Sequence, residues 1–459
     1  MNAGWPTAEQ IARVLLLQDY NTRVVCFGTM LLGVCAAVVG TFMLLRKRSL
    51  IGDVVGHSSL PGIASAFLIL EILETGSGRS VPGLLVGAAV AGLVGVLATT
   101  TIDRFTRIRD DAALAIVLSV FYGLGIALFT VIQSLPTGNA AGLNHFILGW
   151  VALMTADDVR LFATVTLVTL AVCGLLFKEF SLLCFDEEYA AARGFPVVGL
   201  DLLLMGLVIG VTVIGLQSVG LLLVVALPIL PAASARFWTD RLGRMTLIAA
   251  GIGGASAWLG VVLSALVPRV PAGPTIVLAG AAGFLVSLLF GTRRGIVHRW
   301  RAHRRTTREV GEHELLRAMY ELGEDQASGW RHPPGPNAST GIAVSVDVLL
   351  RSRSWSPTRL RAILARARRT GLIDAEPSDR YRFTPAGAAE AARVVRNHRL
   401  WELYLIRYAD VAPGHVDRDA DLIEHVLEPE LIAELERELP RSLTTAPVPQ
   451  SPHALAHDR

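Results

Sequence analysis

The sequence predicts an all-α polytopic membrane protein with about nine transmembrane helices, followed by a mainly α-helical soluble part. The chain of 459 residues is 52% apolar, and its mean hydropathy of +0.50 is too high for an ordinary soluble protein. Leu, Val, Ala and Gly dominate residues 24–291, whereas residues 292–459 carry mixed charges in helical patterns. Between the two parts, residues 292–310 hold seven Arg and one acid, which is typical of a basic segment beside a membrane. We expect this linker, 292–311, to contact anionic membrane lipid rather than nucleic acid.

The transmembrane count comes from apolar runs of about 20 residues, the length that crosses the hydrocarbon core as a helix. Such runs occupy residues 24–45, 51–73, 81–100, 112–132, 158–178, 200–217, 218–235, 245–267 and 273–291. The stretch 200–235 is too long for one helix, and GLQSVG (215–220) supplies a turn that divides it. HFILGWVALM (145–154) is too short to cross, so we expect it to be re-entrant or to extend the next span. Eight or ten spans are the alternatives.

The orientation is predicted from Lys and Arg, because cytoplasmic loops are richer in them. The basic groups of one face are RKR (46–48), DRFTRIR (103–109), Lys178 with Arg193, and RFWTDRLGR (236–244). The short loops of the other face carry only Arg79 and Arg269. We therefore expect residues 1–23 outside the cell membrane and the C-terminal part in the cytoplasm.

An acid and a histidine interrupt the second span, in SLIGDVVGHSSLPGI (49–63). Ionisable residues inside a membrane are costly and usually functional. Asp53 and His57 are four residues apart, so they project from one face of a helix. Carboxylate and imidazole suit a divalent cation such as Zn²⁺ or Mn²⁺. The alternative is that Asp53 bonds a backbone N–H at the interface and His57 bonds a neighbouring helix. Candidates for further groups on a cation path are Ser58, Ser59, His145 and Asp201.

A polar loop, residues 178–201, lies on the predicted cytoplasmic face and is helical at its centre, with Glu188 six residues before Gly194. It predicts either a docking helix for a cytosolic partner or a simple connector. The four cysteines (Cys26, Cys35, Cys173 and Cys184) are in or beside apolar runs without a CxxC pair, so we expect packing roles. The chain contains no Walker A motif, nucleophile elbow or HExxH, so no intrinsic enzyme activity and no organic cofactor are expected.

These stretches resemble the membrane subunits of bacterial ABC importers for zinc, manganese and iron. RSLIGDVVGHSSLPGIA carries a GDxxxHxxLPG-like pattern, and the stretches 109–126, 143–150 and 185–236 extend the match across 24–291. The resemblance implies a homodimeric or pseudosymmetric permease, an extracytoplasmic solute-binding lipoprotein and a separate ATP-binding subunit. It implies that Asp53 and His57 are metal ligands on the path. It also implies that 185–196 docks the ATPase through Glu188, Ala191 and Gly194, although Tyr189 stands where an Ala is usual.

The soluble part reads as a winged helix-turn-helix over residues 312–387. Apolar residues at helical spacing predict helices over 312–325 and 342–355, separated by a Pro/Gly-rich loop. In the next helix Ser356 is the expected N-cap, Pro357 the first position and Gly371 the end. Its expected inner face is Leu360, Ile363, Leu364 and Ala367, and residues 373–387 read as a hairpin. Candidates for DNA contact are Arg359, Arg361 and Arg366. The alternative is a winged helix used only for protein contacts.

The sequence 383–439 resembles the dimerisation region of the iron- and manganese-dependent repressors, the diphtheria-toxin-repressor family. TPxG…RNHRLWE and LIEHVLEPE carry the match, which covers roughly 312–440 and implies a helical metal-binding and dimerisation region at 388–440. The implied cytosolic metal ligands are Glu314, His398, Glu402, Asp417, Asp421, Glu424 and His425. Arg317 departs from the pattern, because manganese-sensing members carry a second carboxylate there. The alternative for these residues is a solvated acidic helix face, and the tail 441–459 is expected to be disordered.

The two resemblances together predict an importer subunit for Mn²⁺, Zn²⁺ or Fe²⁺ with a cytosolic metal-sensing domain. That domain is expected to slow transport when metal is plentiful, or to repress the operon of the transporter by binding DNA, either tethered or after cleavage within 292–312. Two alternatives are a membrane-tethered metal-dependent repressor and an importer of metal chelates of the siderophore type. Carboxylate and imidazole accept several cations, so the metal itself stays open.

Overall fold

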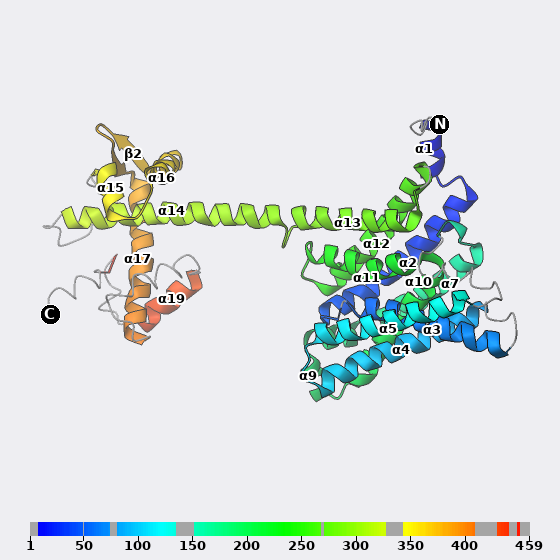
Figure 1. Ribbon diagram of the computed structural model, residues 1–459. Helices are drawn as coiled ribbons and strands as arrows, with labels where there is room; N and C mark the ends of the chain where they lie inside the picture. Colours follow the sequence, from blue (N-terminus) through cyan, green and yellow to red (C-terminus); the bar gives the residue numbers. More distant parts are fainter. Residues whose placement is uncertain are drawn as a thin grey trace. The chain divides into compact units, whose positions relative to one another are not determined.

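The computed structural model describes residues 8–48, 50–73, 80–134, 151–267, 270–326, 343–408, 429–439 and 448–449. His145 and the four predicted ligands from Asp417 to His425 lie outside these residues. The chain forms two compact units, residues 1–299 and 300–459, which are described separately (Figure 1). The boundary falls within the basic linker predicted between a membrane part and a soluble part.

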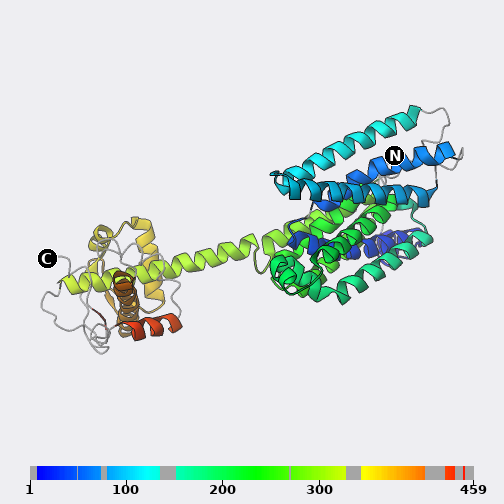
Figure 2. The same ribbon diagram turned by 90° about the horizontal axis from the view of Figure 1, so that it is seen from below.

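The first unit is entirely helical in its described part. Its elements are α1 (Ala8–Leu15), α2 (Tyr20–Leu45), α3 (Ile51–Leu73), α4 (Val81–Phe105), α5 (Asp110–Ser134), η3 (Val151–Leu153), α7 (Ala156–Leu175), α8 (Phe177–Phe185), α9 (Glu187–Ala192), α10 (Val197–Val219), α11 (Leu221–Arg236), α12 (Leu242–Leu266) and α13 (Ala272–Phe290). Helices α3, α4 and α5 pack together at one edge of the bundle (Figure 2). Short helices α8 and α9 lie within the predicted cytoplasmic loop, as expected for its centre.

Helix α11 is shorter than the predicted seventh span. Among the described residues, eight helices are long and apolar enough to cross a membrane, and α11 has only 16 residues. Its ends nevertheless lie beside those of α13: a Cβ on Gly273 would be 3.8 Å from the Val219 carbonyl oxygen. At the other end, the Phe237 carbonyl accepts a 3.1 Å hydrogen bond from the Arg293 N–H. The described part of the chain therefore holds eight membrane-length helices and the shorter α11 where nine spans were predicted, and Gly220 (φ 77°) lies at the predicted turn.

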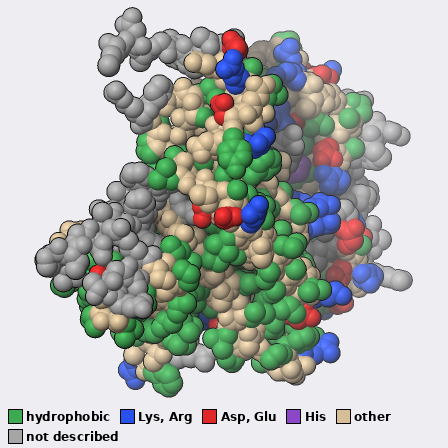
Figure 3. Space-filling model, turned by 90° about the vertical axis from the view of Figure 1, so that its right-hand side faces the viewer, with side chains coloured by type: hydrophobic (Ala, Val, Ile, Leu, Met, Phe, Trp, Pro, Cys, Tyr) green, Lys and Arg blue, Asp and Glu red, His purple; other side chains and the backbone are tan. Residues whose placement is uncertain are grey.

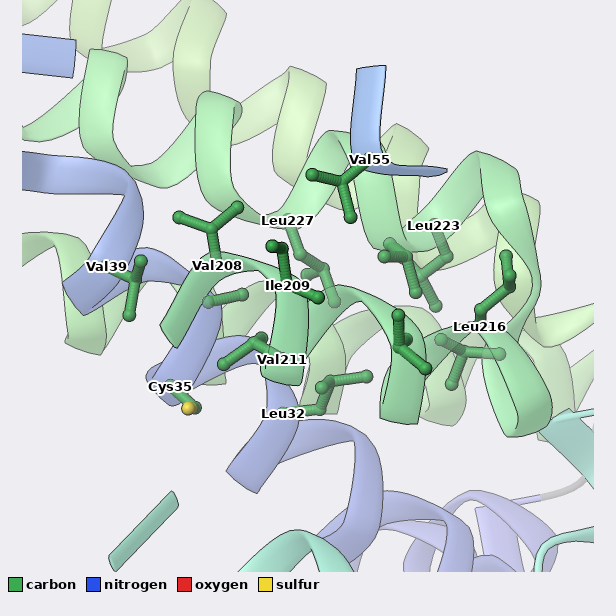
Figure 4. Packing of buried hydrophobic residues seen from close by; sticks show 14 of the residues in the cluster. Leu32, Cys35, Val39, Val55, Val208, Ile209, Val211, Leu216, Leu223 and Leu227 are labelled. Atoms are coloured by element: carbon green, nitrogen blue, oxygen red, sulfur yellow. The ribbon is translucent and has the colours of Figure 1, made fainter. Parts of the chain in front are cut away.

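Close contacts between helix backbones hold the bundle together. A Cβ on Gly62 of α3 would lie 2.2 Å from the Gly87 carbonyl oxygen of α4. A Cβ on Gly33 of α2 would lie 2.7 Å from the Gly253 carbonyl oxygen of α12. Small residues at helix contacts are the usual means of association in membranes, where van der Waals packing replaces the hydrophobic effect between helices. Around these contacts α2, α3, α10 and α11 bury a continuous apolar core (Figure 4).

Apolar side chains also cover much of the outside of this unit. Leu167, Leu247 and Leu278 on three different helices are 70%, 75% and 68% exposed. Figure 3 shows hydrophobic side chains over the lower part of the visible face, with few charged ones among them. An apolar exterior on membrane-length helices is what a lipid environment requires.

The second unit contains the predicted winged helix. Its elements are α14 (Ile296–Gln326), β1 (Val344–Ser345), α15 (Val346–Ser352), α16 (Pro357–Arg369), β2 (Ile373–Glu376), β3 (Arg380–Phe383), α17 (Pro385–Tyr408) and α19 (Pro429–Glu438). The strands form an antiparallel sheet in the order β1-β3-β2, with β2 and β3 as the hairpin. Two expectations need correction. Residues 342–355 hold a strand and a short helix, because β1 pairs with β3. The linker is helical from Ile296 onward and continuous with the first helix of the domain.

The local signals of the central helix α16 are confirmed. The Ser356 hydroxyl accepts from the Arg359 N–H at 3.3 Å, Pro357 is the first residue and Gly371 has φ 73°. The predicted inner face is at most half-exposed, with Leu360, Leu364 and Ala367 buried against α14 and α15 residues. The fold thus sets the arginines of α16 on its outer surface.

Candidate functional site

The acid–histidine pair of the second span is brought together on α3. Asp53 lies in the first turn of α3 and His57 one turn later, with Asp53 Oδ1 3.2 Å from His57 Nε2. The side chains are 26% and 20% exposed, so both are partly accessible. A carboxylate in the first turn is also favoured by the helix dipole. With a rise of about 1.5 Å per residue, the pair lies near the end of the span, not at its midpoint.

The imidazole of His57 is oriented by α5. Its ring meets that of Tyr122 edge to face, with centroids 5.1 Å apart and planes at 86°. Its Nδ1 atom is buried and has no hydrogen-bond partner among the described residues. The ring nitrogen beside the Asp53 carboxylate is Nε2, and imidazole and carboxylate are both donor groups that divalent cations accept. No group of three or more His, Cys, Asp or Glu that could hold a metal occurs in the described parts of the chain.

Two of the other predicted path residues have different partners. The Ser58 hydroxyl donates to the Val54 carbonyl of its own helix at 2.6 Å. A Cβ on Gly95 of α4 would lie 2.6 Å from that hydroxyl, so Ser58 faces α4. Asp201, the fifth residue of α10, accepts from Arg46 at 2.7 Å and Arg48 at 3.0 Å. His145 lies outside the described residues.

The predicted docking segment forms an exposed helix at one end of the bundle. Asp186 caps α9 by accepting from the Tyr189 N–H at 2.8 Å, and Gly194 follows it with φ 83°. Of the residues expected to face the ATPase, Glu188, Ala191 and Gly194 are all exposed, whereas the neighbouring Ala190 is buried against the bundle. The helix therefore has an inner side and an outer side, as a docking element requires.

A buried arginine connects α9 to the bundle. The Arg46 side chain at the end of α2 is 6% exposed and donates to Glu187 of α9 at 2.9 Å. It also donates to the Leu183 carbonyl of α8 at 3.1 Å and to Asp201. Burial raises the pKa of the adjacent Cys184 thiol to about 12, and the Arg46 charge opposes that rise. In the sequence Arg46 served only to predict the orientation of the chain in the membrane. No regular spacing links it to Glu187 or Asp201, so these contacts could not be predicted.

The second acid–histidine pair lies on α17 of the soluble unit. His398 Nε2 is 3.3 Å from Glu402 Oε1, and both side chains are 2% exposed. The guanidinium of Arg317 on α14 approaches His398 from the other side, with Nη1 3.1 Å from Nδ1. Arg317 also donates to Glu321 at 2.7 Å, and Glu321 accepts from Arg353 at 3.1 Å.

These contacts test whether His398 and Glu402 fit the implied metal. A guanidinium has only donors, so His398 Nδ1 must be the acceptor and Nε2 must carry the proton. Neither ring nitrogen then offers a lone pair to a metal. In this arrangement Arg317 lies on the Nδ1 side of the His398 ring and Glu402 lies beside Nε2.

The other residues of the implied sensor are placed elsewhere. Glu314 accepts from the Trp355 indole N–H at 3.2 Å and lies 3.7 Å from Arg359, so it faces the start of α16. The remaining predicted ligands (Asp417, Asp421, Glu424 and His425) lie outside the described residues. The structure thus brings together His398 and Glu402 and gives Glu314 separate partners.

The arginines expected to contact DNA are partly engaged within the domain. Arg359 pairs with Glu314, and Arg366 lies 3.2 Å from Glu312. Glu312 is also bound by the Thr370 hydroxyl at 2.7 Å. Arg361 is exposed. Internal pairing lowers the charge that α16 can offer to phosphates.

Two further groups near the crossing of α14 and α17 have shifted pKa values. A hydrogen bond from Arg393 lowers the pKa of Glu390, against the effect of burial. Burial raises the pKa of Tyr320 to about 12, and the charge of Glu324 adds to that rise.

Membrane-length helices with an apolar exterior define a polytopic membrane protein. The chain belongs to the ABC 3 transport family, whose model matches residues 18–291. Residues 384–444 match the iron dependent repressor, metal binding and dimerisation domain. The permease and the repressor-like domain are therefore joined in one chain.

Curated relatives and a solved structure support the permease assignment. The chain is 36% identical over 409 residues to the manganese transport system membrane protein MntC of Bacillus subtilis, covering 88% of each. It is 41% identical to the zinc transport system membrane protein TroC of Treponema pallidum, covering 64% of this chain and 97% of that protein. The solved structure of PsaBC from Streptococcus pneumoniae in complex with Fab matches with 31% identity and a TM-score of 0.54, covering 65% of this chain and 99% of that one.

Proposed function

We propose that the chain is the membrane subunit of an ATP-driven importer of a divalent transition metal, with Asp53 and His57 as ligands on the path. The observation that carries this proposal is the pair itself, with Asp53 beside Nε2 and a buried, partner-free Nδ1. Two ligands from one chain give a site that a cation can enter and leave, as conduction requires. The manganese and zinc transport systems of the relatives are consistent with Mn²⁺ or Zn²⁺, and Fe²⁺ suits the same donors.

We infer the partners of the chain from its sequence motifs and from the exposed helix α9. No Walker A motif occurs in its sequence, so a separate ATP-binding subunit supplies hydrolysis and docks at α9. An extracytoplasmic solute-binding protein delivers the metal, and a second permease copy completes the path. The end of the bundle that carries Arg46, Arg48 and Arg294 is the cytoplasmic end, because basic residues favour that side.

The experiment is uptake of Mn²⁺, Zn²⁺ and Fe²⁺ in a transporter-deficient bacterial strain that expresses the chain with its two partner proteins. Native protein should restore uptake of at least one metal, and Asp53→Ala and His57→Ala should abolish it at normal membrane levels. Asp157→Ala is the matched control, because it removes an 85%-exposed carboxylate on α7. Unchanged uptake of all three metals in both path variants would refute the assignment.

For the repressor-like domain we propose regulation of its own transporter in preference to DNA binding. Internal pairing of Arg359 and Arg366 with Glu314 and Glu312 supports this choice. The formed winged helix and the exposed Arg361 keep DNA binding as the second candidate. A mobility shift of the full chain in detergent with its upstream DNA separates them. A shift that depends on Mn²⁺ and is lost in Arg361→Ala would establish the repressor function.

A further inference from the structure

The turn that follows α2, residues 46–48, holds an exposed lysine in the left-handed region of backbone space. Lys47 has φ 59°, and its N–H donates to the Leu44 carbonyl at 3.2 Å. The next N–H, that of Arg48, donates to the Met43 carbonyl at 3.0 Å. These two hydrogen bonds form a Schellman motif, in which the left-handed position is usually a glycine. A lysine there destabilises the turn, because its Cβ crowds the backbone.

One carboxylate binds the residues on both sides of this lysine. Asp201 of α10 accepts from Arg46 at Oδ1, at 2.7 Å, and from Arg48 at Oδ2, at 3.0 Å. The side chains of Asp201, Arg46 and Arg48 are 15%, 6% and 22% exposed. Charged hydrogen bonds are strong, and partial burial strengthens their electrostatic part further. We call Asp201 with its two arginines the clamp, since it can hold a turn that the lysine alone disfavours.

The clamped turn leads directly into the proposed path site. Helix α3 begins three residues after Arg48, and its first N–H donates to the Arg48 carbonyl at 3.1 Å. Asp53 lies in the first turn of this helix, and His57 lies one turn later. A change in the backbone at Lys47 would therefore move the start of the helix that carries both side chains.

We propose that Asp201 is a positioning residue for metal transport. Through its two arginines it holds the left-handed turn at Lys47, and it thereby fixes the first turn of α3, where the acid–histidine pair lies. The inference rests on the proposed function, because that function assigns the pair to the cation path. It gives Asp201 a role other than that of a path ligand, since each of its carboxylate oxygens already accepts from an arginine.

The test uses glycine, which adopts positive φ without a steric penalty. Asp201→Asn keeps the size of the side chain but leaves a single oxygen to accept, so it weakens the clamp. If the turn carries the effect, adding Lys47→Gly should restore the Asp201→Asn variant. Lys47→Ala is the matched control, because it removes the same charge without giving freedom at positive φ. Neither change at Lys47 would restore a protein that had lost a path ligand.

The first measurement is the initial rate of Mn²⁺, Zn²⁺ and Fe²⁺ uptake in a transporter-deficient strain that also expresses the two partner proteins. Asp201→Asn should raise the KM for the transported metal about 5- to 30-fold, the factor that corresponds to the cost of one left-handed residue. At matched membrane levels, Asp201→Asn with Lys47→Gly should return toward the native KM, and Asp201→Asn with Lys47→Ala should not.

The second measurement is hydrogen exchange of the full chain in detergent, which does not depend on transport. Asp201→Asn should speed exchange of the amides of residues 50–54, and Lys47→Gly should reverse that change. Unchanged exchange at these amides, or equal KM values for the two double variants, would overturn the proposal.

Two further variants keep the test decisive. If Asp201→Asn fails to insert into the membrane, Arg48→Gln replaces it, because Arg48 is less buried than Arg46 and its loss leaves the other arm of the clamp. Asp53→Ala separates this proposal from the proposed function. If that variant takes up metal as the native protein does, the path site is refuted, and the exchange result alone then decides whether the clamp holds the turn.

Discussion

Two acid–imidazole pairs in this chain share nearly the same geometry and differ in their surroundings. Asp53 and His57 are 3.2 Å apart, and His398 and Glu402 are 3.3 Å apart, each pair four residues apart on one helix. The first pair is partly exposed, and one ring nitrogen has no partner among the described residues. The second pair is buried and bound to Arg317. The comparison shows that the four-residue spacing places the two side chains together. Contacts from the neighbouring helix then determine whether the pair is open to a cation.

The largest expected effect comes from removing the Arg317 guanidinium, which contacts the second pair and has no counterpart at the first. Arg317→Met removes a buried guanidinium that contacts Glu321 and His398, and breaking a buried charged contact typically costs about 3–5 kcal/mol. Hydrogen exchange of the full chain should show loss of protection in α14 and α17, with the first unit unaffected. Arg353→Met, at the more exposed end, should cost about 1 kcal/mol or less. Native-like protection in Arg317→Met would mean that the guanidinium is not needed there.

The second prediction weakens the first pair without changing its shape. Asp53→Asn keeps the size of the side chain and removes the charge that attracts a divalent cation. Loss of one of two ligands should lower metal uptake about 100-fold, which corresponds to about 2.7 kcal/mol. The check is initial uptake rate at matched membrane levels, with Asp157→Asn as the control. Uptake within about twofold of the native rate would remove Asp53 from the path.

The third prediction concerns the neighbour of the first pair. Tyr122→Leu removes the edge-to-face contact that orients His57, and such contacts are worth about 0.5–1.5 kcal/mol. The KM for metal uptake should rise about 2- to 12-fold with little change in the maximal rate. Tyr122→Phe keeps the ring and should behave as the native protein does. Equal KM values for Leu and Phe variants would show that the ring does not position His57.

The smallest expected effect concerns a partly exposed ion pair on the helix that carries the second acid–imidazole pair. Comparing it with the buried pair shows how burial changes the cost of losing a charge. Glu390 pairs with Arg393, which lowers the pKa of the carboxyl below its ordinary value of 4.5. A lowered folded-state pKa stabilises the fold above pH 4.5, and this contribution is lost as the pH falls through the folded-state pKa. The pair is partly exposed, so Glu390→Gln should cost less than about 1 kcal/mol at pH 6.

Unfolding of native and Glu390→Gln chains at pH 6 and at lower pH checks this last prediction. The difference in unfolding free energy should shrink toward zero as the pH falls below 4.5. A difference that stays constant with pH would assign the effect to packing and not to charge.

The sequence predicted the features that depend on residues close together along the chain. The apolar runs predicted nine spans, of which eight are membrane-length helices in the described part of the chain, and the i, i+4 spacing predicted both acid–imidazole pairs. Ser356, Pro357 and Gly371 predicted both ends of α16. These features depend on neighbours within a few residues, so helix geometry and backbone preferences are enough to determine them. The short strand β1 was missed because its structure comes from pairing with β3.

What the sequence by itself determined about this protein is therefore its division into a membrane unit and a winged-helix unit, and the residues of each pair. Only the tertiary structure decided what those pairs contact. Arg46 meets Glu187 and Asp201 across more than 140 residues, and Arg317 meets His398 across 81 residues. The physical reason is that charge compensation in a buried site depends on distance in space, and no periodicity in the sequence records it.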